Sequence, residues 1–136
     1  MADATHHGRC QICGRRLGLS VMALIRAHYF RAMPCSGAGN PPIEKDDRFL
    51  EASIAQVDAE RSACAAEIQQ LRRARANWID PRIAERVDEL DAALSRLRRR
   101  LQHNRSWPLR FERQMRTQGW GTPPPPYLLA QLGASA

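Results

Sequence analysis

Three cysteines and one histidine in the first third of the chain have the spacing of a metal site. Cys10 and Cys13 lie two residues apart, and His28 and Cys35 follow them. Structural zinc is held tetrahedrally by thiolate sulfur and imidazole nitrogen at about 2.0 to 2.3 Å, and a Cys-x-x-Cys turn supplies two of the four ligands. The spacing therefore predicts that these four residues bind Zn²⁺.

Two alternatives to this ligand set remain open. His6 or His7 could take the place of His28, and the cysteines could be ordinary reduced thiols beside a surface histidine. Gly14 suits the positive φ that often follows such a turn. The apolar run 19–25 is predicted to form a short helix that presents His28 from its last turn.

Three segments resemble the small zinc-finger proteins found in bacterial phages and mobile elements. They are Cys10-Gln11-Ile12-Cys13-Gly14-Arg15, Ala27-His28-Tyr29-Phe30-Arg31 and Pro34-Cys35-Ser36-Gly37-Ala38. The resemblance covers residues 8–44 and implies zinc and a phage-like origin. Because that family has Gly after the His and a longer Gly-rich insert before the last Cys, the two patterns differ there.

The middle of the chain predicts two helices joined by a short turn. Turn and breaker residues fill positions 36–43, which we interpret as a linker out of the metal module. Heptad steps of four and three then define one seam from Ile54 to Trp78, broken by two arginines, and a second from Ile83 to Leu101. Asp80 and Pro81 match a helix N-cap and first position. Two helices this close in sequence should lie antiparallel, with Cys64 as a small core residue in the first seam.

The predicted fold class is mostly α, with an N-terminal zinc finger, an antiparallel coiled-coil hairpin and a short C-terminal helix. The predicted divisions are a flexible N-terminus at 1–7, the finger at 8–43, the hairpin at 44–105, a helix at 106–119 and a Pro-rich arm at 120–136. Ser106 would cap the short helix. The Pro-rich arm is either a docking element or a disordered tail.

Charge separates the finger from the hairpin. The net charge of the 136 residues is +7, which favours a polyanionic partner. In an antiparallel hairpin the arginines at 96–100 would face acidic residues at 58–67, so those charges are predicted to be structural. The finger instead has no acidic residue between Arg9 and Glu44. Its predicted nucleic-acid-binding residues are Arg9, Arg15, Arg16, Arg26, Tyr29 and Arg31.

The residues do not support an enzyme. A zinc deaminase needs a Glu beside its His ligand, and an HNH-type nuclease needs a further catalytic His; neither pattern is present near His28. Four protein ligands also leave no open position for a reacting water, so the metal would fold a module too small to fold alone.

Two functions therefore remain. The first is a phage-encoded protein whose basic finger binds nucleic acid, DNA in preference. The second is an adaptor or inhibitor that binds a host or phage protein through the finger and the hairpin. A homodimer formed through the hairpin is compatible with both. No stretch reaches the roughly 20 apolar residues of a membrane span, and the cysteine pattern suits a reducing cytoplasm, so we expect a cytoplasmic protein.

Overall fold

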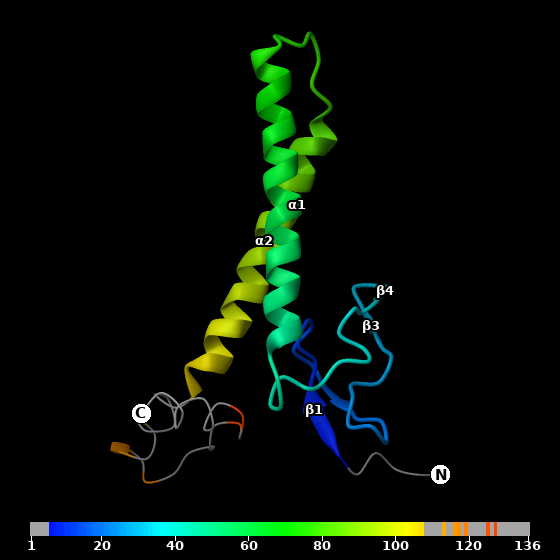
Figure 1. The fold of residues 1–136 in the computed structure, drawn as a ribbon, viewed down its shortest axis with the longest axis vertical. Helices are drawn as coiled ribbons and strands as arrows, with labels where there is room; N and C mark the ends of the chain where they lie inside the picture. Colours follow the sequence, from blue (N-terminus) through cyan, green and yellow to red (C-terminus); the bar gives the residue numbers. More distant parts are fainter. Residues whose placement is uncertain are drawn as a thin grey trace. The chain divides into compact units, whose positions relative to one another are not determined.

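A computed structural model describes residues 6–107 and the single residues 113, 116, 117, 119, 125 and 127. Two small strand pairs precede two long helices, and Figure 1 shows their order along the chain. The strands are β1 (His7–Arg9), β2 (Arg16–Gly18), β3 (Tyr29–Phe30) and β4 (Met33–Pro34). The helices are α1 (Arg48–Arg73) and α2 (Pro81–Arg105), with 26 and 25 residues. Because helix makes up only about half of the described residues, the predicted mostly α class holds only in part.

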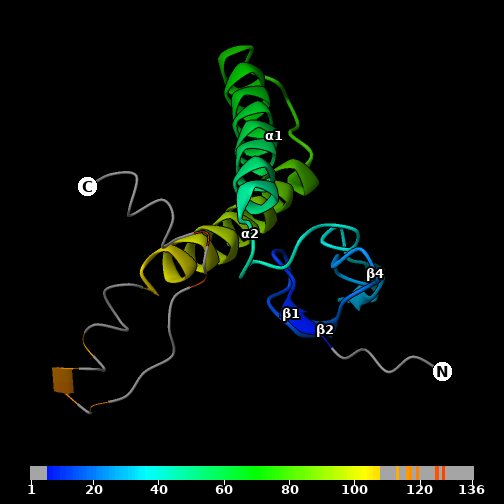
Figure 2. The same cartoon turned by 60° about the horizontal axis from the view of Figure 1, so that its bottom comes forward.

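The N-terminal module consists of two short antiparallel hairpins. β1 pairs with β2 so that Arg9 lies opposite Arg16, and β3 pairs with β4 through a turn at Arg31 and Ala32. Both of these turn residues have positive φ, 53° and 63°, which non-glycine residues rarely adopt. Figure 2 shows the two strand pairs on separate stretches of the module.

The predicted short helix at 19–25 is wrong. The described chain forms a loop there, closed by a bridge between Leu19 and Ile25. Ser20 Oγ accepts hydrogen bonds from the N–H groups of Met22 and Leu24, both at 3.3 Å, and a serine that bonds the local backbone in this way competes with a helix. Ile25 is buried as a result, whereas Val21 is fully exposed.

The segment 36–43 is packed into the module, which corrects its interpretation as a linker. Ile43 is buried and its N–H donates to the carbonyl of Arg9 at 2.9 Å. The N–H of Ile25 likewise donates to the carbonyl of Asn40 at 2.9 Å. These bonds pair backbone groups of the segment with groups far away in the sequence, as buried backbone requires.

Helices α1 and α2 form an antiparallel pair between residues 51 and 99. The carboxylate of Asp58 lies 3.5 Å from Arg98, and that of Asp91 lies 2.7 Å from Arg61, so partner numbers fall on α2 as they rise on α1. The α2 seam is the apolar side, with Leu90, Leu94 and Leu97 buried. On α1 the predicted seam positions up to Leu71, including Cys64, are half-buried. Regular coiled-coil packing remains a prediction.

The first seam ends earlier than predicted. α1 stops at Arg73, and Arg75 adopts a φ of 52°. The N–H of Ala76 then donates to the carbonyl of Leu71 at 3.0 Å, the closing bond of a Schellman-type C-terminus. Arg75 and Trp78 therefore leave the seam, and Trp78 is 70% exposed.

The predicted start of α2 is confirmed. The helix begins at Pro81, and Asp80 Oδ1 accepts a hydrogen bond from the N–H of Arg82 at 3.0 Å. This bond satisfies one of the N–H groups that lack an intrahelical acceptor. Arg82 also pairs with Asp80 and lowers the pKa of that carboxyl group through hydrogen bonding.

The chain divides into two compact units that differ from the predicted divisions at 43 and 105. One unit is Met1–Leu50 with Arg100–Ala136, and the other is Glu51–Arg99. We call the first of these the N-terminal unit. It contains the two strand pairs together with the first residues of α1 and the last residues of α2. His7, predicted to belong to a flexible N-terminus, lies in β1. The predicted C-terminal helix at 106–119 and the arm at 120–136 fall largely outside the described residues.

Asp47 joins the two helix ends inside the N-terminal unit. Its side chain is only 4% exposed, and its two oxygens accept hydrogen bonds from Arg105 at 3.0 and 3.1 Å. The amide of Asn104 also donates to Asp47 at 3.4 Å, and Tyr127 donates from its hydroxyl at 3.4 Å. The carboxylate is thus buried with several donors around it.

We expect Asp47→Ala to lower the free energy of unfolding by about 2 kcal/mol, because it leaves the buried Asn104 amide and the partly buried Arg105 guanidinium without this acceptor. Asp58→Ala is the control, since its pair with Arg98 is exposed on both sides and should contribute less than about 1 kcal/mol. Urea denaturation of both variants measures the difference. Equal losses would show that the Asp47 network adds no more than a surface ion pair.

Candidate metal centre

The four predicted ligands come together in the folded N-terminal unit. The metal-binding atoms of Cys10, Cys13, His28 and Cys35 all lie within 4.8 Å of one another. Cys10, Cys13 and Cys35 are buried together with Ile25, and Ile12, Leu17, Leu19 and Phe30 pack around them. His28 is half-buried at the edge of this cluster. The four groups are therefore close enough to hold one metal ion.

The distances within the cluster fit a tetrahedral ion. Cys10 Sγ and Cys35 Sγ are 3.7 Å apart, and Cys13 Sγ is 3.4 Å from His28 Nε2. Zinc bond lengths imply edges of about 3.8 Å between two sulfurs and about 3.5 Å between sulfur and nitrogen. A disulfide would require about 2.0 Å between sulfurs. These two distances thus agree with the edges of a tetrahedral metal site, and the other ligand pairs lie within 4.8 Å.

A hydrogen bond determines which nitrogen of His28 faces the cluster. Nδ1 lies 2.8 Å from the carbonyl oxygen of Arg26. A carbonyl only accepts, so Nδ1 carries the proton and Nε2 keeps its lone pair for a metal. His6 and His7 are not part of the cluster.

Two glycines allow the backbone to pass close to the thiols. Gly14 has a φ of 76°, as predicted for the residue after the second cysteine. Its N–H donates to the carbonyl of Cys10 at 3.0 Å and closes the turn. At Gly37, a Cβ atom would lie 2.1 Å from Cys10 Sγ, so only glycine fits against the sulfur. In the sequence, the one signal of this close approach is that Gly37 follows Cys35 by two residues.

The local environment shifts the pKa values of the paired thiols in opposite directions. Burial raises the pKa of Cys10 to about 12. Burial also disfavours the Cys13 thiolate, but hydrogen bonds from Arg15 outweigh it and lower the pKa of Cys13 to about 7. Metals bind thiolates, so Cys13 is the more readily ionised of the two.

The two residues between Cys10 and Cys13 connect the cluster to both helices. Gln11 is 1% exposed, and its Oε1 accepts a hydrogen bond from the N–H of Leu50 in the first turn of α1 at 2.8 Å. Gln11 Nε2 donates to the carbonyl of Pro41 at 2.8 Å. The carbonyl of Ile12 accepts a hydrogen bond from Arg100 of α2. One short turn therefore supplies two metal ligands and holds the ends of two helices.

Arg100 lies beside the cluster, which corrects its predicted place opposite the acidic residues of α1. Its Nε would be 2.9 Å from a Cβ built on Gly14, so the guanidinium lies against that glycine. Burial lowers the pKa of Arg100, and the charges of the three cysteines oppose this change. Three thiolates and one divalent ion carry a net charge of −1, which a neighbouring guanidinium offsets. Neither Arg100 nor Gln11 has a spacing signal in the sequence.

The predicted nucleic-acid-binding residues are all exposed on the same module. Several of their guanidinium groups also bond the backbone. Arg15 donates to the carbonyl of Tyr29, and Arg26 donates to that of Leu19 at 3.1 Å. Arg31 lies over the ring of Phe30 at 5.2 Å. Tyr29 is 67% exposed, so its ring is accessible.

No protein-family model, curated protein or solved structure matches this chain. Neither helix within the described residues has the length and apolarity that a membrane span requires.

We expect one Co²⁺ ion to bind per chain and to give the intense visible absorption of a tetrahedral site with sulfur ligands. His28→Ala should weaken binding or change the spectrum, because it removes the nitrogen ligand. Cys64→Ser is the control, since Cys64 lies on α1 outside the cluster. A stoichiometry that falls with Cys64→Ser but not with His28→Ala would contradict this ligand set.

We expect Arg100→Gln to weaken metal binding about tenfold, the lower range for groups that support metal ligands. The variant loses the bond to Ile12 and the positive charge beside the thiolates. Competition with a chromophoric chelator measures the affinity. Arg99→Gln changes the neighbouring exposed arginine and should have no effect; equal losses in both variants would show that Arg100 acts only through net charge.

Proposed function

We propose that this chain is a non-enzymatic zinc protein whose N-terminal module binds DNA through its basic surface. Zinc is the ion that best suits the ligand chemistry, because three thiolates and one imidazole in a closed tetrahedral arrangement are typical of structural zinc sites. With four protein ligands the ion has no position for a reacting water. Its role is to stabilise a module built from very short strands.

The distribution of paired and unpaired charge carries the proposal. Between Arg9 and Glu44 the module has five arginines and no acidic residue. On the helical pair, by contrast, some of the arginines pair with acids of the facing helix: Arg86 lies 2.7 Å from Glu60, and Arg98 lies 3.5 Å from Asp58. Unneutralised guanidinium groups on one small surface favour a polyanion, and phosphate contacts dominate the affinity of most DNA-binding proteins.

The tip of the β3–β4 hairpin supplies a second kind of contact. Tyr29 is 67% exposed, and Arg31 is exposed in the adjacent turn. An accessible tyrosine ring beside a guanidinium can stack on an unpaired base or lie against a duplex groove. The strained φ values of Arg31 and Ala32 are of the kind that clusters at functional sites.

The remaining parts of the proposal follow from the sequence. The resemblance of residues 8–44 to phage zinc-finger proteins supports a phage-encoded protein, and the cysteine pattern supports the reducing cytoplasm of a bacterial host, where the thiols stay available for metal. A homodimer through the helical pair would cover Ile54, Val57, Ile68 and Leu71, which are half-buried on α1.

We expect the zinc-loaded full chain to bind labelled DNA with an affinity that falls steeply between about 50 and 200 mM salt. Replacing two finger arginines together, Arg16→Gln with Arg31→Gln, should lower the salt slope by about two. Fluorescence anisotropy on duplex and single-stranded oligonucleotides measures both quantities. The charge-matched control is Arg86→Gln with Arg98→Gln on the helical pair, which should leave the slope unchanged.

Binding that is absent or insensitive to salt would overturn this proposal. The second candidate, a protein-binding adaptor or inhibitor, is favoured by one observation: Val21 is fully exposed, and Met22 and Met33 are 73% and 67% exposed on the same module. Capture of one defined protein that survives nuclease treatment and is lost with Met22→Ser would support it instead.

A further inference from the structure

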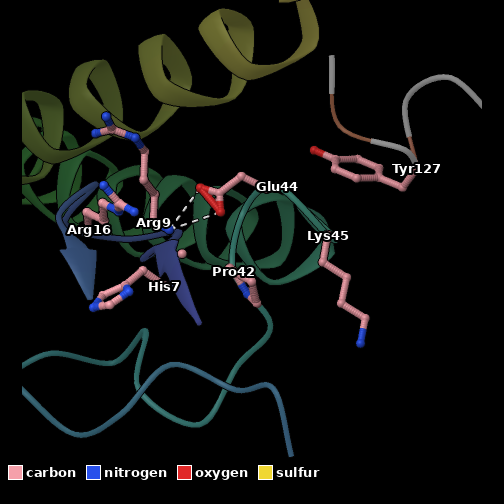
Figure 3. A pocket seen from close by; sticks show the side chains of 8 residues that line it. His7, Arg9, Arg16, Pro42, Glu44, Lys45 and Tyr127 are labelled. Carbon is pink, nitrogen blue, oxygen red and sulfur yellow. Dashed lines mark hydrogen bonds between the residues drawn. The ribbon is translucent and has the colours of Figure 1, made fainter. Parts of the chain in front are cut away.

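A surface cavity of about 630 Å³ lies along the outer face of the β1–β2 pair. Gly8 and Pro42 meet at its base, where a Cβ on Gly8 would lie 2.4 Å from Pro42 Cβ. Figure 3 shows the side chains of His7, Arg9 and Arg16 along the strand pair, with Lys45 beyond Pro42. Four basic side chains therefore line the cavity, together with the carboxylate of Glu44 and the ring of Tyr127.

Strand register places two of these groups directly opposite each other. Arg9 pairs with Arg16 across the strands, and His7 is two residues from Arg9 on the same exposed face. Like charges in directly opposed positions destabilise a strand pair unless something lies between them. An anion between Arg9 and Arg16 would relieve this repulsion. The other arginines of the module have no directly opposed arginine.

The carboxylate of Glu44 lies in the same lining but, within the described residues, forms no ion pair with these side chains. Both oxygens of Glu44 accept a hydrogen bond from the backbone N–H of Arg9, at 2.8 and 3.0 Å. Arg9 directs Nη1 to the carbonyl of Gly14 at 3.3 Å. The side chain of Arg16 makes no hydrogen bond or ion pair among residues 6–107, and no carboxylate there pairs with Lys45. Glu44 thus fixes the strand while the cations remain available.

We propose that this cavity binds a phosphate group, held between Arg9 and Arg16 with His7 and Lys45 at its border. Guanidinium groups present paired N–H donors that match phosphate oxygens. The inference rests on the proposed function for the source of the phosphate, which is the phosphodiester backbone of bound DNA. In this arrangement the β1–β2 pair contacts the phosphodiester backbone of DNA. The β3–β4 hairpin, with Tyr29 and Arg31, makes the separate second contact.

The test uses the zinc-loaded full chain and two probes, inorganic phosphate and a single-stranded oligothymidine. Inorganic phosphate should shift the NMR signals of the Gly8, Arg9, Arg16 and Lys45 amides in a saturable way. At ten times its dissociation constant it should raise the melting temperature by about 5 °C. Arg16→Gln should abolish both responses, whereas Arg98→Gln, the charge-matched control on α2, should keep them.

Stability without phosphate distinguishes binding from a structural role. Arg16→Gln removes the repulsion with Arg9, so the variant should melt at the same temperature as the parent chain or higher. A clearly lower melting temperature would indicate that Arg16 supports the fold and would overturn the proposed role.

The oligonucleotide-binding measurement distinguishes this inference from the proposed function. Arg16→Gln alone should weaken oligonucleotide binding about five- to tenfold at moderate salt, the effect of one phosphate contact. Unchanged DNA and phosphate binding in this variant would overturn the phosphate site while leaving the DNA-binding function intact. Saturable phosphate binding in a chain that does not bind DNA would support the site and reject the proposed function.

Discussion

The turn between Cys10 and Cys13 is the constraint on which the N-terminal unit depends. Its two sulfurs face the metal cluster, and its intervening residues bond the first turn of α1 through Gln11 and the last turns of α2 through Ile12. Metal binding and helix anchoring therefore share the same few backbone atoms. An ion held by this cluster would constrain the same turn from which Gln11 and Ile12 bond the two helix ends.

The charged side chains are also arranged differently in the helical pair and in the N-terminal unit. On the helical pair three arginines form ion pairs with acids of the facing helix, as in the Arg61 and Asp91 pair. In the N-terminal unit Arg100 lies beside the three clustered cysteines, and Asp47 accepts hydrogen bonds from Arg105. The arginines of the two strand pairs lack acidic partners within residues 6–43. The finger is therefore the part of the described chain whose arginines have no acidic residue between them.

Hydrogen bonding explains where the structure differs from the prediction made from the sequence. The apolar run 19–25 has the composition of a helix, but the Ser20 hydroxyl bonds two N–H groups and closes a loop. The segment 36–43 has the composition of a linker, yet Ile43 is buried and its N–H bonds Arg9. In both places, side-chain bonding and distant carbonyl partners outweigh the local propensity that sequence patterns measure.

The sequence by itself determined the features that follow from short-range rules. The spacing of the Cys/His residues, the Asp80-Pro81 helix start and the α2 seam all depend on residue type and chain geometry within a few turns. Tertiary structure alone decided that Gln11 and Arg100 support the metal turn and that Gly37 passes over Cys10. It also placed Arg9 against Arg16. These contacts join residues between 7 and 88 positions apart, so no local pattern specifies them, and only the packed chain brings their atoms together.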